Sequence, residues 1–141
     1  MKHNQQPILL VEDNPMDVEL TLRALDRGKL VNPIEVARDG EEALQWFERW
    51  QEGMPLPVVV LLDLKLPKIN GLEVLQEIKK HPVFKNIPVV VLTTSSNDSD
   101  VRSAYELGVN SYILKPVEFD KFVEVAGQIE VYWNLLNIRP Y

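Results

Sequence analysis

The stretch "PVVVLLDLKLP", residues 57–67, carries five apolar residues in a row, 58–62, and the run ends on the carboxylate of Asp63. A continuous apolar run of this length is typical of a strand that is covered on both faces in a parallel sheet. Further runs of this kind occur at 7–12, 87–94 and 111–115, with a weaker one at 33–37. We therefore expect a sheet of five parallel strands.

The segments between these runs have the pattern of helices. Apolar residues recur three and four positions apart, Pro15 stands at the start of the first segment, and glycines such as Gly28 and Gly108 stand at the ends. We expect helices over about 15–27, 40–50, 71–80 and 98–107, and a longer one from near 118 to beyond 133. This alternation predicts a doubly wound α/β domain with right-handed crossovers.

Composition limits the classes of function. The chain has 141 residues, which suits one domain, and its net charge of −6 argues against nucleic acid as the main partner. It contains no cysteine, so disulfides and thiolate chemistry are excluded. No apolar run is long enough for a signal peptide or a membrane span. We expect a cytoplasmic protein that binds neither DNA nor a membrane.

The residues at the carboxyl ends of the predicted strands point to a chemistry. In an open parallel sheet ligands bind at these ends, which here carry Glu12, Asp13, Asp63, Thr93 and Lys115. Three close carboxylates repel one another unless a cation lies among them, and an all-oxygen ligand set suits Mg²⁺. A lysine and a hydroxyl at the same edge would hold an anion. The set is suited to phosphoryl transfer, with Asp63 as the nucleophile that forms an acyl phosphate.

These features resemble the receiver domains of two-component response regulators. The resemblance covers about residues 7–131 and rests on "LLVEDNP" (9–15), "LLDLKLPKINGLEVL" (61–75), "PVVVLTT" (88–94) and "SYILKP" (111–116). It implies a flavodoxin-like sheet with strand order 2-1-3-4-5. It also implies one receiver domain over residues 1–141, with a C-terminal helix extension and tail at about 132–141.

The resemblance also assigns roles around the predicted phosphoacceptor, Asp63. Glu12 and Asp13 correspond to the acidic pair that holds Mg²⁺ in this family. Asp63 itself and the backbone carbonyl of Lys65 would complete the protein ligands. The chain would thus be a phosphoacceptor that takes part in its own phosphorylation and dephosphorylation, rather than an enzyme.

Three further positions match the family's signalling residues. Thr93 corresponds to the hydroxyl residue that binds the phosphoryl group and moves as a switch. Lys115 corresponds to the lysine that pairs with the phosphoryl group, and Tyr112 to the aromatic switch residue. For Tyr112, plain packing against the sheet stays open as an alternative, because an aromatic residue at this position would pack in either case.

Within the family, three segments resemble the small regulators that are paired with phytochrome-type photoreceptor kinases. They are "ILLVEDNPMDVELT" (8–21), "ERWQEGMPLP" (48–57) and "IEVYWNLLNIRP" (129–140). This narrower resemblance implies a sensor histidine kinase, of the phytochrome type, as the phosphoryl donor.

The predicted last helix carries more apolar residues than one core contact requires. A core-facing stripe is formed by Phe122, Ala126, Ile129, Trp133 and Leu136. Val125, Tyr132 and Leu135 lie off this stripe, so either the helix is wedged more deeply or a surface patch remains. We favour a homodimer that involves this helix and the tail.

Other functions stay open on the sequence alone. The domain could be a constitutive docking receiver or an intermediate in a phosphorelay. A magnesium phosphatase of the haloacid dehalogenase type is less favoured, because that class needs an acid two residues after the nucleophile and this chain has Lys65 there. A nucleotide- or flavin-binding module would need a glycine-rich first turn, where this chain has "VEDNP" (11–15).

Overall fold

Five parallel strands form one sheet in the order β2-β1-β3-β4-β5, which confirms the predicted topology. The computed structural model of the chain describes residues 6–28, 32–115, 120, 121 and 124. The strands are β1 (Ile8–Val11), β2 (Ile34–Ala37), β3 (Val59–Leu62), β4 (Val89–Thr93) and β5 (Ser111–Leu114). Of the predicted C-terminal helix only residues 120, 121 and 124 are described, and all three are helical; the rest of that helix and the tail at about 132–141 lie outside the described residues.

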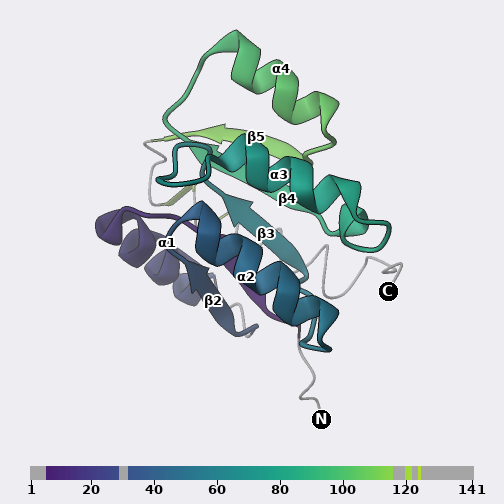
Figure 1. The fold of residues 1–141 in the computed structure, drawn as a ribbon. Coiled ribbons are helices and arrows are strands. Elements are labelled where there is room, and N and C mark those ends of the chain that lie inside the picture. The colour runs from purple at the N-terminus through teal and green to yellow at the C-terminus, as the bar shows by residue number, and fades with distance from the viewer. Residues whose placement is uncertain (1–5, 29–31, 116–119, 122–123, 125–141) are drawn as a thin grey trace.

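Helices connect successive strands, as the sequence pattern predicts. They are α1 (Pro15–Arg27), α2 (Gly40–Gln51), α3 (Gly71–Lys80), α4 (Asp98–Glu106) and the short 3₁₀ helix η1 (Phe84–Asn86). In Figure 1, α2 and α3 lie in front of the sheet and α1 lies behind it. Within the described part of the chain, none of the helices is long and apolar enough to cross a membrane.

The apolar runs supply both faces of the sheet. Along β1, Leu9 and Val11 join the core under α2, α3 and α4, whereas Ile8 and Leu10 join the core under α1. These four side chains are at most 2% exposed. A strand that alternates between two buried faces must be apolar at every position, which explains why the runs are continuous in sequence.

The register of the strands brings their polar ends together. Val11 of β1 lies opposite Leu62 of β3, so the next residues, Glu12 and Asp63, leave the sheet side by side. The Asp63 amide donates to the carbonyl of Val11 at 3.0 Å, which ties the two strand ends to each other. The sheet thus builds one polar rim from residues distant in sequence.

Candidate functional site

Three predicted carboxylates meet at this rim. Oxygen atoms of Glu12, Asp13 and Asp63 lie within 4.8 Å of one another. Glu12 and Asp63 are buried, with 3% and 7% of their surface exposed, whereas Asp13 is exposed. The adjacency of β1 and β3 accounts for the cluster, because Glu12 and Asp13 directly follow β1 and Asp63 directly follows β3.

The predicted lysine also reaches the rim. The Lys115 Nζ atom donates to Glu12 Oε1 at 2.5 Å and to Asp63 Oδ2 at 3.0 Å. Its third bond goes to Asp17 Oδ2 at 2.9 Å. An ammonium has three donors, so this lysine is fully satisfied by carboxylates. We call these four residues, Glu12, Asp17, Asp63 and Lys115, the lysine cluster.

Burial and charge act together on the titration of the lysine cluster. The pKa of Glu12 is raised from 4.5 to about 7, chiefly by burial and also by the charge of Asp63, while the hydrogen bond from Lys115 acts in the opposite direction. Burial by itself would lower the pKa of Lys115, but its bonds to Glu12, Asp17 and Asp63 outweigh that effect and raise it. The lysine therefore carries its charge at neutral pH.

The acidic residues fit a hard divalent cation. Glu12, Asp13 and Asp63 offer only carboxylate oxygens, and Asp17 brings the acids near the rim to four against the one ammonium of Lys115. Oxygen donors with an excess of negative charge are what Mg²⁺ and Mn²⁺ bind in proteins. The predicted metal-binding role of the Lys65 carbonyl stays a prediction.

Asp63 is held by the loop that follows β3. Its Oδ1 atom accepts the backbone N–H of Lys65 at 3.0 Å, and the Gly71 amide donates to the carbonyl of Leu64 at 2.8 Å. A Cβ atom at Gly71 would lie 2.3 Å from the Asp63 carbonyl oxygen and 2.4 Å from the Leu64 Cα atom. Only glycine permits this approach, so the start of α3 presses directly against the backbone that carries Asp63.

The predicted switch residues meet at a serine. Thr93 is fully buried, and its Oγ1 atom accepts the Ser95 amide at 3.4 Å. The Tyr112 hydroxyl donates to the Ser95 carbonyl at 2.8 Å, and the Ser95 hydroxyl donates to Asp100 Oδ2 at 2.6 Å. We call Thr93, Ser95, Asp100 and Tyr112 the serine cluster. It links the end of β4 to β5 and to α4, and its connection to Lys115 is a backbone bond from the Lys115 amide to the Thr93 carbonyl at 2.8 Å.

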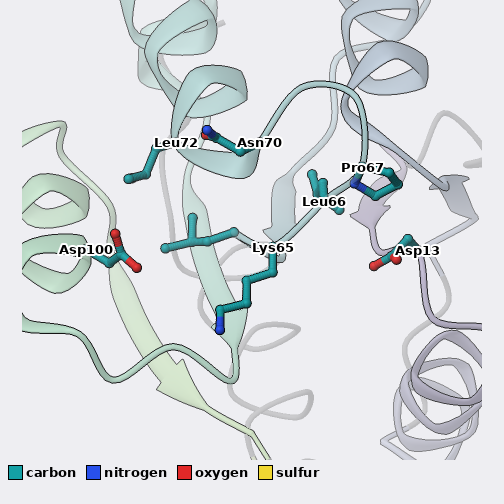
Figure 2. A pocket seen from close by; sticks show the side chains of 8 residues that line it. Asp13, Lys65, Leu66, Pro67, Asn70, Leu72 and Asp100 are labelled. Carbon is teal, nitrogen blue, oxygen red and sulfur yellow. The ribbon is translucent and has the colours of Figure 1, made fainter.

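An open pocket of about 420 Å³ lies beside the rim, between the loop after β3 and α4. Figure 2 shows Asp13 and Asp100 on opposite sides of Lys65, whose side chain extends between them. The pocket lining consists of Asp13, Leu64, Lys65, Leu66, Pro67, Asn70, Leu72 and Asp100. Solvent therefore reaches the exposed carboxylate of Asp13 through this pocket, which the positively charged side chain of Lys65 also lines.

Three residues of the two clusters were not among the predicted site residues: Asp17, Ser95 and Asp100. Asp17 lies in the first turn of α1, where an acid is favourable for the helix in any protein, so its residue type alone carries no signal. Ser95 and Asp100 lie beyond the end of β4, where the path of the loop decides which groups meet.

A family model described as the response regulator receiver domain matches residues 8–126. Among curated proteins, the chain is 46% identical over 134 residues to FilR2 of Methanothrix harundinacea, described as a probable methanogenesis regulatory protein. That alignment covers 94% of this chain and 86% of FilR2. The response regulator Rcp1 of Synechocystis sp. is 42% identical over 128 residues, which cover 89% of this chain and 87% of Rcp1.

Solved structures give the same result. The phosphorylated cyanobacterial phytochrome response regulator RcpA superposes with a TM-score of 0.84 at 38% identity, covering 97% of this chain and 99% of RcpA. The Mn²⁺-bound form of Rcp1 superposes with a TM-score of 0.82 at 40% identity, covering 96% of this chain and 99% of that structure. The rim, the strand order and these matches lead to one conclusion: the chain belongs to the response regulator receiver domain family, and it is homologous to phytochrome response regulators.

Proposed function

We propose that the chain accepts a phosphoryl group on Asp63 from a sensor histidine kinase and uses it to switch contacts with other proteins. The observation that carries this proposal is the position of the Lys115 ammonium, 3.0 Å from Asp63 Oδ2, at a rim that also holds Glu12 and Asp13. A buried nucleophilic carboxylate next to a fixed cation is what phosphoryl transfer to an aspartate requires.

The chemistry follows from the groups at the rim. A carboxylate oxygen of Asp63 attacks the phosphorus, and the bond from phosphorus to the donor's histidine nitrogen breaks, so the imidazole leaves with the electron pair. Lys115 holds the negative charge of the transferred oxygens. Mg²⁺, held by Glu12, Asp13 and Asp63, would neutralise charge between the acids and the phosphoryl group. Later attack of water on the phosphorus breaks its bond to the Asp63 oxygen, releases inorganic phosphate and returns Asp63 to its carboxylate.

The serine cluster would carry the signal away from the rim. The Thr93 hydroxyl corresponds to the group that turns toward the phosphoryl oxygens in this family. Thr93 and Tyr112 both hydrogen-bond to Ser95, and Ser95 also bonds to Asp100 of α4. A movement of Thr93 would therefore shift Ser95 and, through it, the hydrogen bonds that hold Tyr112 and α4. The switch would thus alter the surface formed by α4 and β5.

Labelling with acetyl phosphate tests the assignment of Asp63. We expect Mg²⁺-dependent incorporation of one phosphoryl group, and complete loss of it in Asp63→Asn, because an amide is not a nucleophile toward phosphorus. Asp26→Asn, which removes an exposed acid from α1, is the matched control and should label like the wild type. Normal labelling of Asp63→Asn would refute the proposal.

The kinase would be of the phytochrome type. Support comes from the similarity to RcpA, whose structure is that of a phosphorylated cyanobacterial phytochrome response regulator. Transfer from a panel of purified phosphorylated histidine kinases of the source organism would test this, with initial rates compared across the panel. Fast transfer from kinases without a photoreceptor module, and none from the phytochrome type, would refute it.

Four other aspects of the proposal concern how the chain works in the cell. The output would be protein contact rather than DNA binding, in keeping with a net charge of −6, and the location would be cytoplasmic. The chain would not be a turnover enzyme, so phosphomonoesters should not be hydrolysed catalytically.

A homodimer would form through the C-terminal helix. Sedimentation of the double variant Tyr132→Glu/Leu135→Glu should then report a monomer, while Asp26→Asn stays dimeric.

A further inference from the structure

Asp17 stands apart from the other acids that hold Lys115. Glu12 and Asp63 come from the ends of strands, whereas Asp17 comes from the first turn of α1. Its backbone is fixed there, because the Asn14 side chain accepts the amides of Met16 at 2.9 Å and of Asp17 at 3.2 Å. The side chain of Asp17 is 35% exposed, yet it lies 2.9 Å from an ammonium whose side chain is only 14% exposed.

The other two partners of the lysine have competing tasks. Glu12 and Asp63 belong to the group of acids whose oxygens converge within 4.8 Å and could hold a cation, and Asp17 does not belong to that group. An oxygen that turns toward a divalent cation gives up part of its bond to Lys115, since the two positive charges repel each other. Once Asp63 also carries a phosphoryl group, Asp17 is the carboxylate of the lysine cluster that serves neither the cation nor the phosphoryl group.

We propose that Asp17 is a positioning residue, which keeps the Lys115 ammonium beside Asp63 while Glu12 and Asp63 serve the cation and the phosphoryl group. This inference rests on the proposed function of Asp63. In transfer from the donor acetyl phosphate, an Asp63 oxygen forms a bond to the phosphorus of the donor. The bond from phosphorus to the acyl oxygen breaks, and the carboxylate product leaves with the electron pair. The charge on the transferred oxygens faces the ammonium that Asp17 holds.

A competing explanation is that Asp17 only stabilises α1. An acid in the first turn interacts favourably with the positive end of a helix, whatever lies next to it. Under this explanation a substitution would lower thermal stability but leave the position of Lys115 and the chemistry unchanged. The two explanations therefore differ in what they predict for the lysine.

The first experiment measures the rate constant of phosphorylation by acetyl phosphate at saturating Mg²⁺. Asp17→Ala should be slower than the wild type by about tenfold, because the ammonium loses its fixed position relative to the reacting atoms. Asp17→Asn should fall between them, since its amide oxygen still accepts a hydrogen bond but carries no charge. Asp26→Ala, on the same helix and exposed, should react like the wild type.

The second experiment asks whether Asp17 acts through the lysine. Lys115→Arg keeps the charge but changes its geometry, so adding Asp17→Ala to this variant should cost less than about twofold. In parallel, the ¹⁵N signal of the Lys115 ammonium should be protected from exchange with water in the wild type and lose this protection in Asp17→Ala. Thermal unfolding of each variant shows separately whether α1 is weakened.

The outcomes distinguish the role of Asp17 from the proposed function of Asp63. Equal rates for Asp17→Ala and the wild type would overturn the role of Asp17 and leave Asp63 as the phosphoacceptor. So would a loss of rate on Asp17→Ala that is the same in the wild-type background and in the Lys115→Arg background. Absence of labelling on the wild-type chain would overturn the proposed function and the inference together. A slower Asp17→Ala with an unprotected ammonium supports the inference.

Discussion

The lysine cluster and the serine cluster lie at the same rim but are built from different interactions. In the lysine cluster, three side-chain carboxylates surround one ammonium, and all three bonds run between charged side chains. In the serine cluster, two of the three bonds use the backbone of Ser95, as amide donor or as carbonyl acceptor. One cluster is thus defined by charge and the other by the path of a loop.

The difference indicates which stimulus each cluster can sense. Protons, a divalent cation and a phosphoryl group all change the charge balance around Lys115, so the lysine cluster responds to each of them. The serine cluster responds when the backbone at Ser95 moves. On the proposed function, the lysine cluster would carry out the chemistry and the serine cluster would report it.

The largest effect is expected from removing the centre of the lysine cluster. Lys115→Met leaves Glu12 and Asp63 buried without their cation, and we expect a loss of about 2–3 kcal/mol in the free energy of unfolding at neutral pH without Mg²⁺. Saturating Mg²⁺ should restore part of the loss, because it supplies the missing positive charge. Urea unfolding with and without Mg²⁺ measures both values.

For the same variant, phosphorylation by acetyl phosphate should fall below detection. Lys65→Met is the matched control, since it removes an exposed lysine next to the rim and should keep its stability. Unchanged stability of Lys115→Met would show that the lysine cluster is not held together by charge.

The next effect is a dependence on pH that belongs to Glu12. Its pKa is raised from 4.5 to about 7 in the folded protein, so the folded state binds the proton more tightly than the unfolded state does. This contribution to stability is complete below pH 4.5 and is lost as the pH rises toward 7. Without Mg²⁺, we expect the free energy of unfolding of the wild type to fall by about 3 kcal/mol relative to Glu12→Gln over this range.

Urea unfolding at several pH values checks this difference, in which the titrations shared by both chains cancel. Saturating Mg²⁺ should diminish it at the upper end of the range, because the cation favours the ionised carboxylate. A parallel pH dependence in wild type and Glu12→Gln would contradict the role of burial at Glu12.

A smaller effect is expected in the serine cluster. Ser95→Ala removes the hydroxyl that donates to Asp100 at 2.6 Å, and we expect a loss of about 1 kcal/mol in the free energy of unfolding. Its pH dependence and its Mg²⁺ affinity should match those of the wild type, because no charge of the lysine cluster changes. Ser99→Ala, an exposed position in α4, serves as control. A changed Mg²⁺ affinity would mean that the clusters are not separate.

The smallest effect is expected from Tyr112→Phe. The variant loses the hydroxyl bond to the Ser95 carbonyl, which should cost about 0.5–1 kcal/mol and leave labelling of Asp63 intact. Tyr105→Phe is the matched control, because this ring lies 6.5 Å from Tyr112 and its residue is 51% exposed. Urea unfolding measures the difference; if Tyr112 only packs against the sheet, both variants will have the free energy of unfolding of the wild type.

The sheet and the acids at its edge were predictable for one physical reason. Each strand is buried on both faces and is therefore apolar throughout, so the first polar residue after each run marks the carboxyl end of that strand. Asp63 and Lys115 were found in this way, because parallel strands bring such ends to one rim. The rule needs only the order of apolar and polar residues.

The remaining contacts depend on geometry that the residue order does not determine. Glu12 and Asp13 are neighbours in sequence, yet one is 3% exposed and the other is open to solvent. Asp17 faces Lys115 because Pro15 and the Asn14 cap fix where the helix begins. Ser95 contacts Thr93, Asp100 and Tyr112 only because of the path that the loop after β4 takes.

Lys115 lies 103 residues after Glu12 and 52 residues after Asp63 along the chain. During synthesis the acids of the rim are therefore made long before the lysine that neutralises them. Contacts between residues so far apart in the sequence carry a larger loop-closure cost than local helices do. The ammonium reaches these acids only where β5 is paired with β4, so on the proposed function a receiver without this last strand would present its acids without the cation that faces the phosphoryl group.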